Sequence, residues 1–392
     1  MFYNSEYLLN HKEFEDTTSC KINKFAFYEL IKHAEHSPMC NTMSDFSRKY
    51  FYNMFIPSKG KLPLAINNIY RKYKKNHLEA SFKPTQEIIN IYNNLNVNGY
   101  YVKENFLNEE QVECIRNELN DFDYYSANKK TIKAKLSKIK SEDSLKKIST
   151  YHSMLNGKII EANSYIYKLL INNDFFSQIS NFYFKSKSYL NMLVSFYSNP
   201  ITKDELQDGN FADGLNYHID YSHLRFLKFF IYLTDVDTVE KGSHSLIKKT
   251  HEDKVKYPTS ENDFLEKSIK VFPNKQKGGV IKNSWIKNNF EDKDIINFNK
   301  KKGALMIENT TALHKGNYCF EGNREMISLV FSISNICPHL PKNSVLVNTD
   351  SKNNLNDYKS YCIKDFSFFH EKEYLKKNNL KNKILFKLFS KI

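Results

Sequence analysis

The regular alternation of polar and apolar residues over 214–222 (GLNYHIDYS) constrains the fold of this chain more than any other feature. After Gly214, the even-numbered residues are polar and the odd-numbered residues are apolar. Successive side chains of a β-strand point to opposite faces, so this pattern predicts a half-buried strand. His218 and Asp220 then lie side by side on its polar face.

Other segments in the second half of the chain are also typical of short strands. Residues 226–233 (FLKFFIYL) are almost all apolar, which predicts a strand buried on both faces. Many short strands and few helices predict a mainly β protein with flanking helices, built as a β-sandwich or an open barrel. A helix after 99–106 is expected to begin at Asn108, with Gln111 completing a capping box. The remaining predicted strands are 99–106, 189–197, 303–308, 312–318 and 325–334.

Composition excludes several classes of protein. Hydrophobic residues make up 41% of the 392 residues, which is enough for a packed core. No apolar run reaches the roughly 18 residues that cross a bilayer, and residues 1–20 do not resemble a signal peptide. The six cysteines are scattered without a CxxC pair, which fits free thiols in a reducing compartment. We therefore expect a cytoplasmic protein with no transmembrane segment.

The net charge of +14 raises the alternative of a nucleic-acid-binding protein. Only five of the 58 basic residues are arginine, and the lysines are spread over the whole chain. This distribution fits an AT-rich coding sequence better than a selected polyanion site, so no nucleic-acid partner is expected. Lysines in 129–147 and 252–302 make an anionic small-molecule substrate attractive, although codon drift explains them equally well.

Two histidines and one carboxylate form the candidate site. His218 and Asp220 can reach one metal ion from the same strand face, and His314 lies in a later predicted strand. Arg324 follows ten residues later, and its planar guanidinium suits bidentate capture of a carboxylate. If a five-residue loop joins the two strands, Arg324 and Ser328 share the inward face with His314; a four-residue loop would turn Arg324 outward.

Three alternatives accompany this interpretation. His314 taken alone is more often a hydrogen-bonded core histidine than a metal ligand. A second HxD pair, His251 and Asp253, lies in a lysine-rich stretch without alternation and is not expected to bind metal. Arg225 and Lys228 flank the site strand, where we expect solvated or rim charges.

A set of short motifs points to a known family: 99–102 (GYYV), 216–220 (NYHID), 229–235 (FFIYLTD), 303–309 with 314–316 (HKG), and 323–324 (NR). Together these segments resemble the phytanoyl-CoA dioxygenase family of Fe(II)/2-oxoglutarate oxygenases. The resemblance covers roughly residues 95–337. One departure is Gly316, which stands where some members have a serine that contacts 2-oxoglutarate.

The resemblance implies a double-stranded β-helix, a jelly roll of the cupin type. It implies that His218, Asp220 and His314 hold Fe(II), and that Arg324 pairs with the distal carboxylate of the co-substrate 2-oxoglutarate. Ser328 could supply the missing serine contact, and Tyr232 is a candidate wall of the co-substrate pocket by position. With dioxygen, such an enzyme hydroxylates a C–H bond of a small-molecule or acyl-type substrate and releases succinate and CO2.

The expected domain organisation has three parts: a helical extension over 1–94, the oxygenase domain over 95–337, and a basic, partly helical tail over 338–392. A metal-binding jelly roll without oxygenase activity and a basic nucleic-acid-binding protein stay open as alternatives. The sequence does not indicate the substrate or the oligomeric state.

Overall fold

The structure is a computed structural model, and its description is limited to part of the chain. Nearly all of residues 1–81 and of the predicted tail after 337 lie outside that part, and so do Ser222 and Arg225. The described residues are 15–16, 61, 65, 82–126, 132–155, 159–161, 163–186, 188–202, 215–220, 226–254, 256–258, 260–265, 270–271, 277–278, 280–332 and 346–348.

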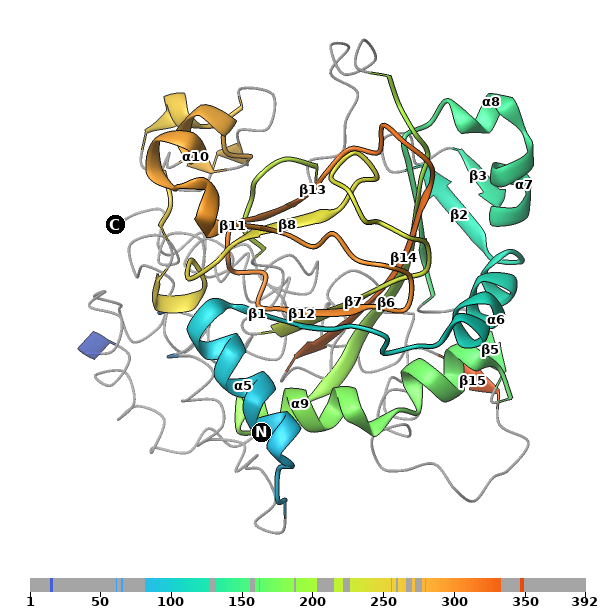
Figure 1. Ribbon diagram of the computed structural model, residues 1–392, viewed down its shortest axis with the longest axis horizontal. Coiled ribbons are helices and arrows are strands. Elements are labelled where there is room, and N and C mark those ends of the chain that lie inside the picture. The colour runs from blue at the N-terminus through green and yellow to red at the C-terminus, as the bar shows by residue number, and fades with distance from the viewer. Residues whose placement is uncertain are drawn as a thin grey trace, which may run out of the picture.

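A large antiparallel sheet of eight strands forms the centre of the molecule (Figure 1). The predicted strands over 189–197, 226–233 and 325–334 are all present in it, with small shifts at their ends. In spatial order the strands are β1 (Tyr100–Lys103), β12 (Leu305–Glu308), β7 (Phe226–Tyr232), β14 (Arg324–Ser332), β6 (Tyr189–Ser198), β4 (Thr150–Met154), β2 (Asp123–Ser126) and β3 (Lys133–Lys135).

A smaller sheet faces the large one. It consists of β11 (Ile295–Asn297), β8 (His244–Ile247) and β13 (His314–Gly316), in that order. Of the predicted strand over 214–222, the described residues 215–220 form one β-bridge, in which His218 pairs with His314 at the edge of β13. The alternation itself is present, because the odd-numbered residues of 215–220 are buried and the even-numbered ones are partly exposed.

The order in which the chain visits the two sheets defines the fold. From β6 onward it runs through β6, the His218 bridge, β7, β8, β11, β12, β13 and β14. The bridge, β8, β11 and β13 lie in the small sheet, and the other four lie in the large sheet. Eight strand positions distributed over two facing sheets in this way form a jelly roll. The predicted fold class, mainly β with flanking helices around a double-stranded β-helix core, is confirmed.

Helices and short elements surround the two sheets. The helix after Asn108 is α6, and its predicted capping box with Gln111 is present. The helices are α5 (Gln86–Asn98), α6 (Glu109–Leu119), α7 (Leu136–Ser141), α8 (Asp143–Lys146), α9 (Asp174–Phe184), α10 (Asn283–Asn289) and the helical turns Tyr167–Ile171, Glu252–Lys254, Glu261–Asp263 and Asp292–Asp294. The remaining strands form two small pairs, β5 (Ile159–Glu161) with β15 (Leu346–Asn348) and β9 (Lys270–Val271) with β10 (Lys277–Gly278).

The three-part domain organisation stays a prediction. Helix α5 runs through residue 94 and packs against β1 and α9, so the chain is continuous there with the jelly roll. Among the described residues, no helix is long and apolar enough to span a bilayer.

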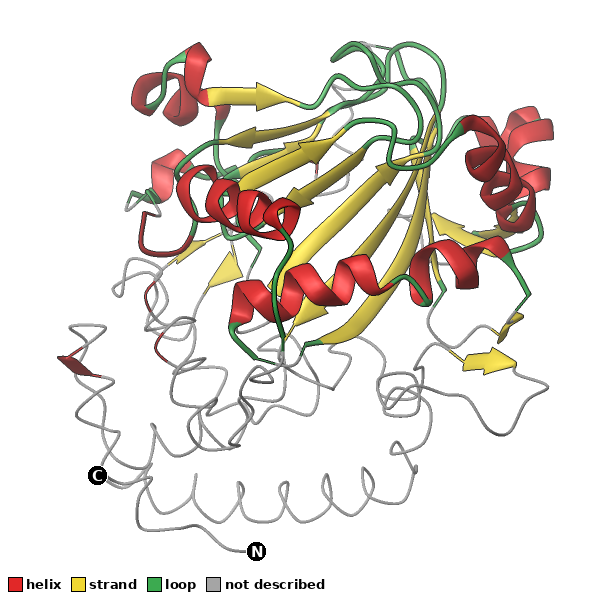
Figure 2. Ribbon diagram, turned by 60° about the horizontal axis from the view of Figure 1, so that its bottom comes forward, coloured by secondary structure: helices red, strands yellow, loops and turns green. Residues whose placement is uncertain are grey.

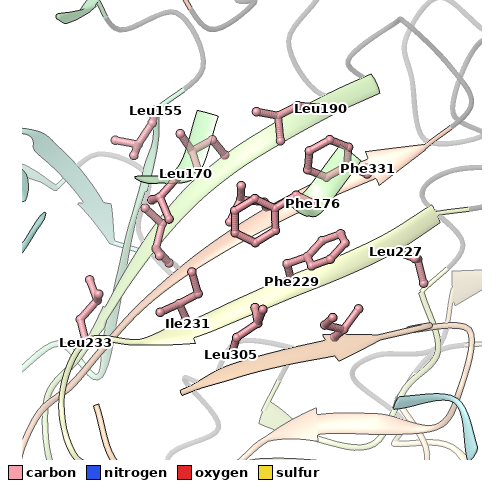
Figure 3. Packing of buried hydrophobic residues seen from close by; sticks show 14 of the residues in the cluster. Leu155, Leu170, Phe176, Leu190, Leu227, Phe229, Ile231, Leu233, Leu305 and Phe331 are labelled. Carbon is pink, nitrogen blue, oxygen red and sulfur yellow. The ribbon is translucent and has the colours of Figure 1, made fainter. Parts of the chain in front are cut away.

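The outer face of the large sheet packs against helix α9 (Figure 2). Phe176 of α9 is fully buried, and its ring lies 5.2 Å from that of Phe229 on β7 and 6.4 Å from that of Phe331 on β14. Figure 3 shows these three rings among the aliphatic side chains of the main core cluster. Odd-numbered residues of β7, β12 and β14 point to this side.

The inner face of the large sheet points to the small sheet. Even-numbered residues of the same three strands form a second, separate apolar cluster there, which includes Phe230, Met306 and Met326. Because side chains alternate along each strand, these residues share their face with the polar even-numbered ones. Lys228, Glu308, Arg324 and Ser328 therefore point into the interior of the jelly roll.

Replacement of Phe176 by alanine tests the packing of α9 on the sheet. Loss of a fully buried phenylalanine side chain leaves a cavity between α9, β7 and β14. We expect the free energy of unfolding to fall by about 3–5 kcal/mol, measured by chemical denaturation. Val97 of α5 is 53% exposed, so Val97→Ala is the control and should change stability by less than about 0.5 kcal/mol. Equal effects of the two changes would contradict this packing.

Candidate metal centre

The backbone brings His218 and His314 together. The N–H of His218 donates to the carbonyl of His314, and the N–H of His314 donates to the carbonyl of His218, both at 3.0 Å. Two residues opposite each other in an antiparallel bridge present their side chains on the same face. The two imidazole rings accordingly lie 4.3 Å apart between centroids.

Asp220 joins the two histidines from the same segment. Its N–H donates to the carbonyl of Thr310 at 2.8 Å, which continues the pairing two residues beyond His218. Oδ2 of Asp220 lies 3.2 Å from Nε2 of His314, and Oδ1 lies 3.7 Å from Nε2 of His218. One donor atom from each of the three side chains lies within 4.8 Å of the other two. It is the one group of three such side chains with this geometry in the described part of the chain.

Hydrogen bonds to the backbone orient both imidazoles. Nδ1 of His218 lies 2.7 Å from the carbonyl of Asn216, and Nδ1 of His314 lies 2.9 Å from the carbonyl of Ala312. A carbonyl only accepts, so each Nδ1 carries the proton and donates. The Nε2 lone pairs then face Asp220, as in a histidine ready to bind a metal.

The electrostatics keep His218 and Asp220 in the protonation states that a metal requires. Burial, followed by the neighbouring His314, lowers the pKa of His218 to about 3, so its imidazole is neutral at physiological pH. Burial alone would raise the pKa of Asp220. Lys228 in the first place, together with His314 and His218, outweighs burial and holds the pKa of Asp220 well below its ordinary value. A neutral imidazole and an ionised carboxylate are the forms that ligate metals.

The centre is buried on one side and partly exposed on the other. The side chain of His314 is only 3% exposed, whereas those of His218 and Asp220 are 22% and 19% exposed. His314 therefore forms the floor of the centre, and the other two side chains form the side through which a ligand can enter.

Arg324 begins strand β14 on the inner face, and its side chain is buried. Its guanidinium donates to the carbonyl of Gly242 and, at 3.1 Å, to Oγ of Ser198, while Nε has no partner among the described residues. Gly242 has a φ of +78°, and a Cβ there would lie 2.5 Å from Sγ of Cys319. Only glycine therefore lets this carbonyl approach the guanidinium.

Tyr232 and Ser328 complete the predicted set on the same inner face. The hydroxyl of Tyr232 accepts from the backbone N–H of His244 at 2.8 Å, and burial raises the pKa of this phenol. Ser328 is buried and lies opposite Phe230 of β7 in the sheet register. The sheet thus places Arg324, Ser328 and Tyr232 on the wall that faces the small sheet, which carries the His218–Asp220–His314 group.

The predicted reason for the orientation of Arg324 is wrong, although the orientation itself is as expected. The hypothesis assumed a hairpin, in which loop length sets the register between the strands of His314 and Arg324. In the structure β13 pairs with β8, whereas β14 pairs with β6 and β7. The two strands lie in opposite sheets, so the inward direction of Arg324 is set by its register with β6 and β7.

Sequence reasoning missed three polar residues of the interior. Lys228 was expected to be a solvated or rim charge, but its Nζ lies 2.5 Å from Oδ2 of Asp220. His244 of β8 and Glu308 of β12 are both buried, with Nε2 of the histidine 2.9 Å from Oε2 of the glutamate. The sequence did contain a signal for Lys228, because it is the one charged residue in the otherwise apolar strand 226–233. A lone charge in such a strand indicates a partner in the interior.

The second HxD motif has a structural role. His251 is buried, and its Nε2 lies 3.1 Å from the carbonyl of Asn96 at the end of α5. The next residue, Glu252, accepts from the Tyr183 hydroxyl at 2.9 Å and from the Asn309 side chain at 3.0 Å. Its backbone N–H also donates to the hydroxyl of Thr311. This buried network anchors the 309–311 turn, whose Thr310 carbonyl receives the N–H of Asp220.

Comparisons with known proteins find similarity only at the level of solved structures. No family model and no curated protein matches the sequence. HygX from Streptomyces hygroscopicus with nickel and 2-oxoglutarate bound is 13% identical, with 64% of this chain and 87% of HygX covered and a TM-score of 0.38. The non-heme alpha ketoglutarate dependent epimerase SnoN is 11% identical (62% and 82% covered, TM-score 0.39). EctD from S. alaskensis with bound Fe is 13% identical (66% and 83% covered, TM-score 0.41).

Removal of one side chain of the group tests the centre directly. We expect His218→Ala and Asp220→Asn to weaken Mn(II) binding more than roughly 100-fold. Mutation of a residue that only hydrogen-bonds to a metal ligand typically lowers the metal affinity by about 10–100-fold, and loss of the ligand itself has a larger effect. Water proton relaxation in Mn(II) titrations measures this affinity. Asp237→Asn is the matched control, because Asp237 pairs with Lys241 outside the centre. Unchanged affinity in both site variants would show that these residues do not bind metal.

The lowered pKa of His218 predicts how the stability of the chelator-treated protein depends on pH. In the unfolded chain this imidazole takes up a proton below about pH 6.5, whereas in the folded chain it does so only near pH 3. The unfolded state binds more protons between these values, so the free energy of unfolding falls as the pH falls through this window. Between about pH 7 and 5 the contribution of His218 is about 2 kcal/mol.

Chemical denaturation of the wild type and His218→Asn at the two pH values measures this contribution. The variant should lose less stability than the wild type on acidification. An equally steep loss in both proteins would assign the acid sensitivity to other groups.

Proposed function

We propose that this chain is an Fe(II)- and 2-oxoglutarate-dependent dioxygenase that hydroxylates a C–H bond of a small-molecule or acyl-type substrate. The observation that carries the proposal is the convergence of His218, Asp220 and His314, with both Nε2 atoms and one carboxylate directed to a common point. Two histidines and one carboxylate that leave neighbouring coordination positions open are the donor set of non-heme iron oxygenases.

The donor chemistry fits iron(II). Both imidazoles have Nδ1 hydrogen-bonded to backbone carbonyls, burial keeps His218 neutral, and Asp220 is held ionised. Both Nε2 atoms would therefore bind the metal without a change in tautomer. With 2-oxoglutarate and dioxygen the iron supplies the oxidising chemistry, and the reaction releases succinate and CO2. The apolar inner cluster around Phe230 and Met306 keeps bulk water from this side of the centre.

Arg324 is the residue best suited to the distal carboxylate of 2-oxoglutarate. It is a buried cation on the inner face, and one of its guanidinium nitrogens has no partner among the described residues. A buried guanidinium binds a carboxylate through short, charge-assisted hydrogen bonds. Ser328 would add a hydroxyl from the same strand, and Tyr232 would form a wall of the pocket, since both lie on this face. The motifs around these residues favour the phytanoyl-CoA dioxygenase family within this class.

Succinate formation from 2-oxoglutarate tests the function. We expect the full-length chain with added iron(II) to convert 2-oxoglutarate to succinate, slowly without substrate and faster when a substrate is present. His218→Ala should abolish iron-dependent turnover, because one of the three iron ligands is lost. Arg324→Lys should raise the KM for 2-oxoglutarate by roughly tenfold or more, because an ammonium cannot replace a bidentate guanidinium.

Each alternative predicts a different outcome. A metal-binding jelly roll without oxygenase activity binds Mn(II) but never forms succinate across a broad substrate panel, which would contradict the proposal. A nucleic-acid-binding protein shows steeply salt-dependent binding that His218→Ala leaves unchanged. Asp237→Asn, outside the centre, should retain full turnover.

A further inference from the structure

Lys228 is the one charged residue of strand β7, and it lies next to the metal centre. It lies on β7 with Phe230 and Tyr232 on the same inner face. Its Nζ lies 2.5 Å from Oδ2 of Asp220, the oxygen that is also nearest to His314. Any ligand bound at the centre next to Asp220 therefore meets this ammonium group.

Among the described residues, no other anion pairs with this ammonium once Asp220 binds a metal. Glu308 lies opposite Lys228 in the register of β12 and β7, but its carboxylate lies against Nε2 of His244 at 2.9 Å. Two cations a few ångströms apart in a poorly solvated site repel each other strongly. An apolar side chain would complete the wall without this cost, so a lysine here indicates that an anion binds beside the metal.

The anion at Lys228 is distinct from the one proposed at Arg324. Lys228 aligns with Val330 in the register between β7 and β14, and Arg324 lies six residues earlier on β14. Six strand residues separate the two backbone positions by roughly 20 Å along the sheet. Ser198, the direct register partner of Arg324, holds the guanidinium close to its own backbone position. The two cations thus enter the inner face from different positions along the strands.

The exposed fraction of the Lys228 side chain indicates that the substrate carries this anion. The side chain of Lys228 is 20% exposed, like those of Asp220 and His218, whereas His314 on the floor is 3% exposed. Lys228 belongs to the side of the centre that is open to solvent among the described residues, where a substrate would arrive.

We propose that Lys228 binds an anionic group of the substrate, a carboxylate or a phosphate, and holds it beside the metal centre, so that the substrates of this enzyme are acids. This inference rests on the proposed oxygenase function. It makes Lys228 a specificity-determining residue that acts through direct contact with the substrate.

The test compares a simple acid with its neutral amide as probes. Butanoate and butanamide are titrated separately into the full-length chain loaded with Mn(II) and saturated with 2-oxoglutarate, and the paramagnetic broadening of their proton signals is measured. We expect wild type to bind butanoate at least tenfold more tightly than butanamide, as a charge-assisted hydrogen bond provides. Lys228→Met should abolish this preference, and Lys228→Arg should restore most of it.

Lys300→Met is the matched control, because Lys300 pairs with Glu104 on the surface, and it should behave as wild type. Circular dichroism and Mn(II) affinity establish that each variant is folded and loaded. Unchanged butanoate preference in Lys228→Met overturns the inference. So does a tenfold loss of 2-oxoglutarate affinity with butanoate binding intact, because Lys228 would then serve the co-substrate.

Failure of the proposed function has a separate signature. If wild type and His218→Ala enhance water relaxation equally in Mn(II) titrations, no metal binds at the centre, and both proposals are contradicted. If Mn(II) binding requires His218 but the two probes bind equally to wild type, only the assignment of Lys228 is contradicted.

Discussion

The reciprocal backbone hydrogen bonds between His218 and His314 are the interaction on which the candidate centre depends. They join two segments far apart in the chain, and they bring the two imidazole rings to 4.3 Å between centroids. Because side chains in a bridged pair share one face, the donor atoms converge as soon as the bridge forms. Asp220 follows from the same pairing, since its backbone bonds to Thr310 just before the strand of His314 begins.

Buried networks hold this pairing in place from outside the centre. Glu252, Tyr183 and Asn309 bind one another under the 309–311 turn, which ties helix α9 to the backbone that receives Asp220. On the outer face of β14, Glu325 receives Arg116 of α6 at 2.7 Å and Lys140 of α7 at 3.0 Å. These contacts fix the strand that carries Arg324. Helices that contribute no side chain to the centre thereby determine its geometry.

The interior of the jelly roll combines an apolar wall with a few charges of both signs. The described inner face carries two carboxylates, Asp220 and Glu308, and two cations, Lys228 and Arg324. Buried charges persist only when they have partners. Here Asp220 pairs with Lys228, Glu308 lies against His244, and Arg324 donates to the carbonyl of Gly242 and the hydroxyl of Ser198. Such a surface can receive a dication together with anionic ligands without leaving a net charge inside the protein.

Periodicity along the sequence determined which residues face which way. The alternation around His218, the apolar strand after residue 226 and the cap at Asn108 all depend on neighbours within a few residues, and each is present in the structure. The choice of His218, Asp220 and His314 over His251 followed from the same local patterns. Only the tertiary structure decided that β13 and β14 lie in opposite sheets, which directs Arg324 inward through a register with β6 and β7. It also decided that Lys228 meets Asp220, because strand partners are chosen by contacts between distant segments that leave no local pattern in the sequence.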